Sequence, residues 1–432
     1  MTQSPRSRIR PTRVELPNGL VVICHENHAN PTVSIHGLVK AGAIFDPIER
    51  SGLSSFVTAM LDRGTATRTA FQQAEALESI GASLHLDSGP EMVTFTANTL
   101  SEDLGTVLGI LADALRNPAF APDQIEKARD EQTVRVRISS ENTTFVASRA
   151  ANEMLFPREH PYHRSPIGTE TSMAAITRED LVSFHASRFG PDAVALVLVG
   201  DVDPGAAAEH VKRVFLDWPR LPEPTPFAVP RAPAPARPAR RVAHMKGKSQ
   251  VDVVYAFPGI ARTDPDYYAT MIMNYVLGGG SLSSRLMDHL RDRQGLVYGV
   301  YSNLNAGIGA GPLQIRAGTN PANTDRTAEE ILVQVKRMYE EGPTETELAE
   351  AVSYLTGVFP VRLETNSGVA AQLLGAEVYG LGLDYIDRYP SIIRGVSLDA
   401  VRAAGRAYLR PAGYALAVAG SVPEDALVAE AR

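Results

Sequence analysis

The sequence predicts an α+β fold of two homologous repeats, each a mainly antiparallel sheet with helices packed on it. One observation is internal similarity: AVALVLVGDVDP at 193–204 resembles GYALAVAGSVPE at 413–424, and the segments before both keep the same offset. The other is the order of strand-like and helix-like segments within the first repeat. They do not alternate singly as in a doubly wound parallel sheet, so antiparallel pairing fits better.

The strands of the first repeat are predicted from apolar and β-branched content. GLVVI at 19–23 and TVSIHGLV at 32–39 carry this composition, and MVTFTANTL at 92–100 alternates between apolar and polar residues. A further apolar segment ends at Gly200 and closes the repeat. These segments supply the strands of one sheet.

The helices of the first repeat are predicted from helical spacing and end signals. The segment 72–80 has this spacing and is followed by Gly81, a typical helix C-terminal residue. A second helix is expected at 104–115, and others are expected after Pro122 and after Pro204.

A proline-rich segment separates the two repeats. In WPRLPEPTPFAVPRAPAPARPARR, Trp218 to Arg241, proline recurs every few residues and favours extended, semi-rigid backbone. We therefore predict an N-terminal repeat at 1–217, a linker at 218–241 and a C-terminal repeat at 242–432.

Composition excludes several classes of protein. The 432 residues are 44% hydrophobic and 21% charged, as in a globular chain, and a net charge of -7 gives no basic field for nucleic acid. No segment approaches the roughly 18 apolar residues of a membrane span. The N-terminus lacks the apolar core of a secretion signal, which predicts a cytoplasmic protein, or a periplasmic one if a signal was trimmed. A single cysteine, Cys24, allows no internal disulfide.

The segment GLSSFVTAMLDRGT at 52–65 begins with a predominantly apolar helix. Its apolar residues wrap around much of the helical circumference, which predicts burial on more than one side. From the residues alone, a helix of the protein core is the simplest interpretation.

The sequence around this helix resembles a known family. SIHGLVKAGAIFDPIER at 34–50 precedes it and ALESIGASLHLDSGPEMVTFTA at 76–97 follows it. Together they resemble the pitrilysin-like zinc metallopeptidases, which include insulin-degrading enzyme, mitochondrial processing peptidase and short bacterial relatives. The resemblance covers nearly the whole chain. It implies a helix with the motif H-x-x-E-H, in which two histidines bind zinc and the glutamate acts on the attacking water. A glutamate further along the chain is the third ligand.

In this sequence the corresponding positions hold Ser55, Thr58, Ala59 and Arg135. Zinc requires three deprotonated nitrogen, sulfur or oxygen ligands, which hydroxyls, a methyl group and a guanidinium do not provide. Thr58 cannot act as a carboxylate base near neutral pH. We expect no cofactor in this chain and no hydrolysis by the family mechanism.

Other histidine-containing segments do not form an alternative site. CHENH at 24–28 is interpreted as a solvated strand end or turn, because neighbouring side chains of a strand point to opposite faces. FPREH at 156–160 and AAAEH at 206–210 lack the first ligand of the motif. HPYHRSPIGT at 160–169 matches an ordinary loop of the family.

The second repeat contains LGGGSLSSRLMDHLRDRQGLVYGVYS at 277–302. Its glycines lack the lysine and the layout of a nucleotide site. We predict a helix at 282–293 and a strand at 296–301, which bring Arg291 near Tyr298 across a tight turn. Arginine near a helix C-terminus and tyrosine in a strand are also common structural choices.

The resemblance implies a specific role for Arg291 and Tyr298. They match a family pair that lies opposite the zinc and donates hydrogen bonds to the bound peptide. A chain that has lost the zinc ligands and kept this pair looks like the metal-free subunit of a heterodimeric zinc endopeptidase acting on extended peptides. Its partner would be an H-x-x-E-H homologue that carries the zinc.

Two alternatives stay open at this point. One is a non-enzymatic peptide-binding or scaffold protein of the same fold. The other is new chemistry at Ser55, for which the neighbouring Thr58 and Ala59 offer no base.

Overall fold

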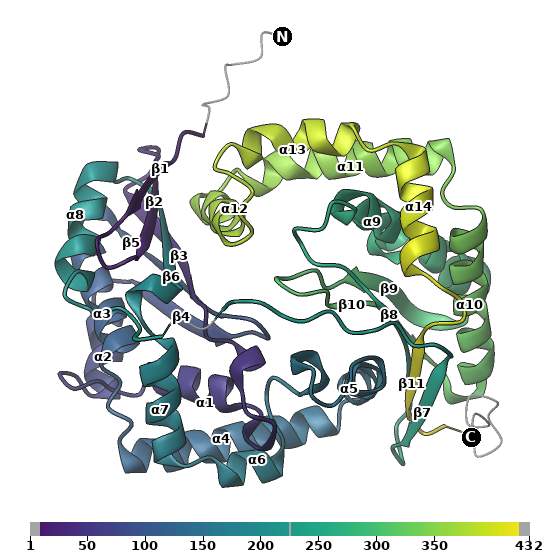
Figure 1. Cartoon of the computed structure of the whole chain (residues 1–432), viewed down its shortest axis with the longest axis horizontal. Helices are drawn as coiled ribbons and strands as arrows, with labels where there is room; N and C mark the ends of the chain where they lie inside the picture. Colours follow the sequence, from purple (N-terminus) through teal and green to yellow (C-terminus); the bar gives the residue numbers. More distant parts are fainter. Residues whose placement is uncertain (1–8, 224–225, 423–432) are drawn as a thin grey trace. The chain divides into compact units, whose positions relative to one another are not determined.

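The computed structural model describes residues 9–223 and 226–422. The chain forms two compact units, and Figure 1 shows one β-sheet with packed helices in each. Among the described residues, the first unit comprises 9–133, 166–223, 226–227 and 359–389, and the second comprises 134–165, 228–358 and 390–422. Among the helices of the described ranges, none is both long and apolar enough to cross a bilayer.

The first unit contains a six-stranded sheet. In spatial order its strands are β1 (Thr12–Glu15), β2 (Val21–Glu26), β6 (Val194–Gly200), β3 (Thr32–Val39), β5 (Val93–Leu100) and β4 (Ser83–Ser88). The β2–β6 pair is parallel, and the other neighbours are antiparallel. β1 and β4 are the edge strands, and the sequence patterns did not single them out because their residues are largely exposed or half-buried.

The second unit contains a five-stranded sheet of the same design. In spatial order its strands are β7 (Ala239–His244), β11 (Ala415–Gly420), β8 (Val251–Pro258), β10 (Pro312–Thr319) and β9 (Val297–Leu304). The β7–β11 pair is parallel, and the remaining pairs are antiparallel. Without β1, the first sheet has the same strand order, so the predicted fold of two mainly antiparallel α+β repeats is confirmed.

The helices are distributed between the two units. In the first unit they are α1 (Leu53–Met60), α2 (Ala70–Glu78), α3 (Leu104–Arg116), α6 (Glu170–Ala175), α7 (Arg178–Arg188), α8 (Pro204–Phe215) and α12 (Asn366–Val378). In the second unit they are α5 (Thr143–Leu155), α9 (Tyr267–Asn274), α10 (Thr324–Glu340) and α14 (Leu398–Tyr408). The residues of α4 (Pro122–Ser140), α11 (Glu345–Arg362) and α13 (Tyr385–Arg394) are divided between the units.

Each unit includes a helix from the other half of the sequence. In the first unit α12 packs on β3 and β6, and Asn366 accepts a hydrogen bond from Asn27 at 2.7 Å. In the second unit α5 packs on β8 and β11, and the Thr143 hydroxyl donates to Asp252 at 2.5 Å. Each compact unit therefore combines the sheet of one repeat with a helix of the other.

The central strands lie between helical layers. Figure 1 shows α3 and α8 on one side of the first sheet and α12 on the other. All seven residues of β6 and all six of β11 are buried, which explains why both read as continuous apolar segments. The described residues of the proline-rich segment from 221 to 238 contain no helix or strand.

Candidate functional site

Helix α1 holds the residues predicted to replace the zinc-binding motif. It starts after Gly52, whose φ of 88° is in the left-handed region. The buried carboxylate of Asp46 accepts hydrogen bonds from the backbone N–H groups of Gly52 and Ser54, at 2.7 and 2.9 Å, which satisfies the start of the helix. Seven of its eight residues are buried, as its apolar pattern predicts.

The hydroxyl groups of α1 have partners close by. Ser55 and Thr58 are each 5% exposed. The Thr58 hydroxyl donates to the carbonyl oxygen of Ser54 at 2.8 Å, within the helix. The Ser55 hydroxyl donates to Oε1 of Gln132 on α4, at 3.4 Å. Ala59 is partly buried.

The side chain of α4 that contacts Ser55 is therefore Gln132, whereas Arg135 is exposed. The family's spacing from the motif predicts Arg135 as the position that corresponds to the third ligand. The buried residues of α4, which include Ile125, Ala128 and Gln132, recur at helical spacing and mark the packed face. That periodicity is the sequence signal that places Gln132 on the packed face of α4.

The chemistry around Ser55 is that of a packed helix. Hydroxyls and a carboxamide are poor zinc ligands, and neither Thr58 nor Gln132 can act as a general base. Within 9–223 and 226–422, no group of three His, Cys, Asp or Glu side chains is arranged to hold a metal ion.

The CHENH segment differs from its prediction as a solvated strand end. Cys24 is buried on β2, and burial, with a smaller contribution from Asp203, raises the pKa of its thiol to about 12. Burial lowers the pKa of the His25 imidazole. Only the end of the segment is exposed, at Glu26, Asn27 and His28, because β2 continues through Glu26 and keeps Cys24 on its inner face.

The histidines of the HPYHRSPIGT loop have structural partners. His160 Nε2 lies 2.8 Å from the carbonyl oxygen of Pro230, and His163 Nδ1 lies 2.9 Å from that of Phe156. Both contacts connect the loop to neighbouring backbone, as its interpretation as structure requires.

The segment that carries Arg291 differs from the predicted helix at 282–293. It begins with a 3₁₀ turn, η7 (Ser281–Ser283), and continues into a π-helix, η8 (Met287–Arg293). η8 ends before Gly295, whose φ of 62° reverses the chain. Leu286 and Leu290 face the core, and Arg291 is exposed. π-Helical turns are rare in proteins overall, and those that occur are often found at functional sites.

Tyr298 lies at a β-bulge of strand β9. Gly318 of β10 pairs with Gly299, but the next residue, Thr319, pairs with Val297, so Tyr298 is the extra residue. Val300 is buried, and regular alternation would place Tyr298 on the same inner face. The bulge instead buries Val297 and leaves Tyr298 63% exposed.

Arg291 and Tyr298 occupy adjoining elements of the second unit. η8 packs against β9, and β9 is an edge strand of the sheet. Within the described part of the chain, neither side chain forms a hydrogen bond or ion pair with another residue. Two strong hydrogen-bond donors therefore lie on and beside an edge strand.

A polar cluster fixes the end of η8. His289 Nε2 lies 2.8 Å from Glu330 Oε2 on α10 and 2.8 Å from Gln294 Nε2. Arg326, also on α10, donates to Gln294 Oε1 at 2.8 Å. The hydrogen bond from His289 holds the pKa of Glu330 below its ordinary value. This cluster anchors the helical segment from which Arg291 projects.

Comparison with protein families finds two matches. Residues 21–159 match the model described as insulinase (peptidase family M16), and residues 175–355 match the peptidase M16 inactive domain. The two segments cover most of both repeats.

Individual relatives and solved structures agree with these matches. A Mycobacterium tuberculosis protein named as an uncharacterized zinc protease is 27% identical over 96% of this chain and 94% of its own. A Helicobacter pylori protein named non-peptidase homolog YmxG is 27% identical over 88% and 87%. The crystal structure of a peptidase M16 inactive domain from Pseudomonas fluorescens has a TM-score of 0.89 and 25% identity, covering 96% of this chain and 98% of that one. The chain therefore belongs to the pitrilysin-like insulinase family, peptidase family M16.

Proposed function

We propose that this chain is the non-zinc subunit of a heterodimeric zinc metalloendopeptidase that acts on extended peptides. The observation that carries the proposal is the exposed pair Arg291 and Tyr298, which lies on and beside the edge strand β9 and has no hydrogen-bond partner among the described residues. A zinc-bearing H-x-x-E-H homologue would supply the metal and the base, and this chain would supply hydrogen-bond donors to the substrate.

The geometry of the pair suits this role. An extended peptide can align with an exposed strand edge through its backbone groups. The bulge directs the Tyr298 hydroxyl outward, and Arg291 on η8 offers a permanently charged donor. Donors aimed at a developing oxyanion contribute about 3 to 4 kcal/mol each to transition-state stabilisation.

The environment of Ser55 supports the proposal that a second chain supplies the zinc ligands and the base. The buried hydroxyls of α1 offer neither zinc ligands nor a base, so hydrolysis would require a second polypeptide. Two similar proteins have names that agree with this, since the Helicobacter pylori relative is named a non-peptidase homolog and the Pseudomonas fluorescens structure is described as an inactive domain. The same names make a non-enzymatic scaffold the second candidate function.

The test is reconstitution with a zinc-bearing homologue of the same family. The chain alone should not cleave unstructured peptides of roughly 10 to 40 residues, and cleavage should appear on mixing. Arg291→Ala and Tyr298→Phe should each lower kcat/KM by about 10² to 10³ without changing assembly, measured by analytical ultracentrifugation.

A matched control lies on the same strand. Tyr301 is also exposed on β9 but pairs regularly with Arg316, outside the bulge. Tyr301→Phe should leave turnover within about threefold of the wild-type complex. Equal cleavage by a complex that lacks both the Arg291 guanidinium and the Tyr298 hydroxyl would contradict the shared active site and favour the scaffold function.

A further inference from the structure

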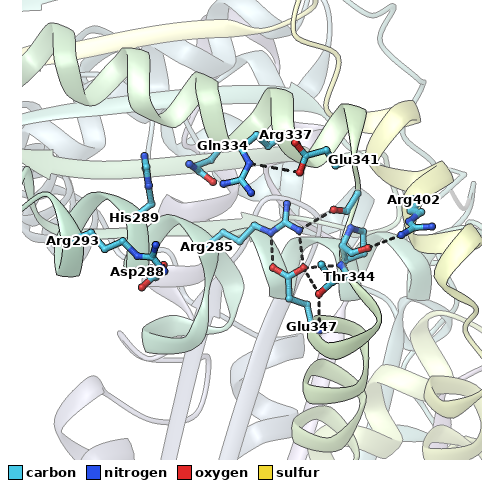
Figure 2. Close-up of a pocket in the computed structure, with 12 residues that line it drawn as sticks. Arg285, Asp288, His289, Arg293, Gln334, Arg337, Glu341, Thr344, Glu347 and Arg402 are labelled. Atoms are coloured by element: carbon cyan, nitrogen blue, oxygen red, sulfur yellow. Dashed lines mark hydrogen bonds and ion pairs between the residues drawn. The ribbon is translucent and has the colours of Figure 1, made fainter.

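The second unit contains a polar pocket distinct from the Arg291 and Tyr298 pair. Its volume is about 370 Å³, and its walls come from η8 and the residue Arg285 before it, from α10, from the turn between α10 and α11 with the start of α11, and from α14. We call it the Arg402 pocket, after the arginine that α14 contributes. Figure 2 shows Arg285, Gln334 and Arg402 approaching it from different helical segments.

Three buried nitrogen atoms of the pocket residues have no hydrogen-bond partner among the described residues. They are Nη1 of Arg285, Nε2 of Gln334 and Nε of Arg402. Gln334 is only 1% exposed. Leaving a buried donor unsatisfied is unfavourable, more so for a charged group, so each of these atoms calls for an explanation. All three groups are donors, so their missing partner is an acceptor.

The charges of the pocket also favour an anion. Four arginines line it, and three of them pair with carboxylates: Arg285 with Glu347, Arg293 with Asp288 and Arg337 with Glu341. The remaining one, Arg402, donates only to the carbonyl oxygen of Pro343, at 3.4 Å. Its guanidinium therefore has no carboxylate partner within the described ranges.

Arg285 is held in place for such a role. Its Nε and Nη2 donate to the two carboxylate oxygens of Glu347 at 2.6 and 2.7 Å, and Nη2 also donates to the carbonyl oxygen of Gly342 at 2.8 Å. Glu347 is itself fixed by Thr344, whose backbone N–H donates to it at 2.7 Å. This bidentate arrangement fixes the guanidinium and leaves Nη1 as its free donor.

We propose that the Arg402 pocket binds the phosphate group of a small molecule. Donors on three separate segments suit a tetrahedral phosphate, whose oxygens point to several sides, better than a planar carboxylate. Arg402 supplies the charge that pairs with the ligand, while Arg285 and Gln334 supply further hydrogen bonds. The volume leaves room for the part of the molecule that carries the phosphate.

Inorganic phosphate is the probe for the test. Isothermal titration and thermal unfolding of the full chain, at constant ionic strength set with sodium chloride, should show saturable binding and a rise in the unfolding temperature. Sulfate, a tetrahedral anion, should bind as well. Acetate, which offers two oxygens, should bind at least about tenfold more weakly.

Substitutions in the Arg402 pocket test whether phosphate binds there. Arg402→Gln and Gln334→Met should each weaken phosphate binding by about tenfold or more. Gln334→Met removes a buried unsatisfied amide and keeps a similar volume, so the variant should fold at least as well as the wild type. Arg406→Gln is the matched control, because Arg406 is exposed on the same helix, α14, and does not line the pocket.

Several results would overturn the proposal. These are the absence of saturable phosphate binding, equal affinity for acetate, and full affinity in both Arg402→Gln and Gln334→Met. An equal loss of affinity in Arg406→Gln would show that phosphate binds through general surface charge, which also overturns it.

Discussion

Replacing Gly278 with alanine should destabilise the second unit and displace the strand that carries Tyr298. Gly278 belongs to the π-helix η6 (Tyr275–Gly279), which packs against β9. A Cβ at this position would lie 2.7 Å from both the backbone nitrogen and the hydroxyl of Ser302, and 2.8 Å from Cδ1 of Leu286. Atoms do not approach so closely, so η6 or β9 must move.

The expected loss of stability depends on the atoms that surround the added methyl group. Ser302 sits opposite Ile315 in the β9–β10 pair, and its hydroxyl donates to the carbonyl oxygen of Asn274 at 3.2 Å, so the strand cannot yield locally. Overpacking of this kind costs about 1 to 3 kcal/mol. For domains of about 150 to 250 residues, each kcal/mol lowers the unfolding temperature by about 2 to 4 °C.

The matched control is the same substitution in helix α11. Gly357 lies inside that helix, and a Cβ there would meet no atom within 4 Å. Alanine in an open helical position stabilises by about 0.5 to 1 kcal/mol relative to glycine. Differential scanning fluorimetry should therefore show opposite shifts, down for Gly278→Ala and up for Gly357→Ala.

The functional assay follows the displaced strand. If β9 moves, Tyr298 moves with it, so a reconstituted complex containing Gly278→Ala should lose turnover, whereas Gly357→Ala should retain it. Equal stability of the two variants would refute the steric reasoning. A destabilised Gly278→Ala with wild-type turnover would refute the link between η6 packing and the position of Tyr298.

Three further predictions concern the rest of the chain. After dialysis against zinc, elemental analysis should find no stoichiometric metal, since Ser55 and Thr58 are not zinc ligands; one tight zinc per chain that depends on Ser55 would contradict this. The Cys24 thiol, buried and with a pKa of about 12, should react with thiol reagents near neutral pH only on unfolding, and rapid labelling of the folded chain would be inconsistent with its position. Burial acts to raise the pKa of Glu347, but hydrogen bonds from Arg285 and Thr344 outweigh it and hold the pKa below its ordinary value of 4.5. Its stabilising contribution is therefore present above about pH 4.5 and lost as the pH falls through the lower folded value, so Glu347→Gln should flatten the acid side of a plot of unfolding temperature against pH.

Elements with strong local signals were predictable from the sequence. β3 occupies 32–39, as its β-branched composition predicts. α8 begins at Pro204, where Asp203 accepts the hydrogen bond from the Ala206 N–H that caps the helix. In both cases the residues that determine the element lie within it or directly beside it.

The helical segment around η8 was not predictable in this way. Its residues favour a helix, and a helix of regular spacing was expected from 282. The structure instead starts with a 3₁₀ turn at Ser281, whose φ is 52°, and then widens into π geometry. These departures depend on packing against β9 and α10, which no local pattern records.

No local sequence pattern predicts that Tyr298 is exposed. Its exposure results from the shift in pairing between β9 and β10, and that register depends on Gly318 and Thr319, some twenty residues away in sequence. The contact between Ser55 and Gln132 likewise joins two helices that are distant in sequence. The residue types at these positions are evident from the sequence, whereas the directions of their side chains are known only from the folded structure.

Helix α1 differs from the segment with Arg291 and Tyr298 in the burial and hydrogen bonding of its polar side chains. In α1, Ser55 and Thr58 are buried and hydrogen-bonded, so the folded state alone accounts for them. Arg291 and Tyr298 are exposed, form no hydrogen bond within the described residues, and sit on a π-helix and a β-bulge, neither of which improves regular hydrogen bonding. Regular packing does not by itself explain two exposed donors on and beside an edge strand with such irregular backbone. The proposed peptide substrate would explain them, because it would supply acceptors that these donors lack within the described residues.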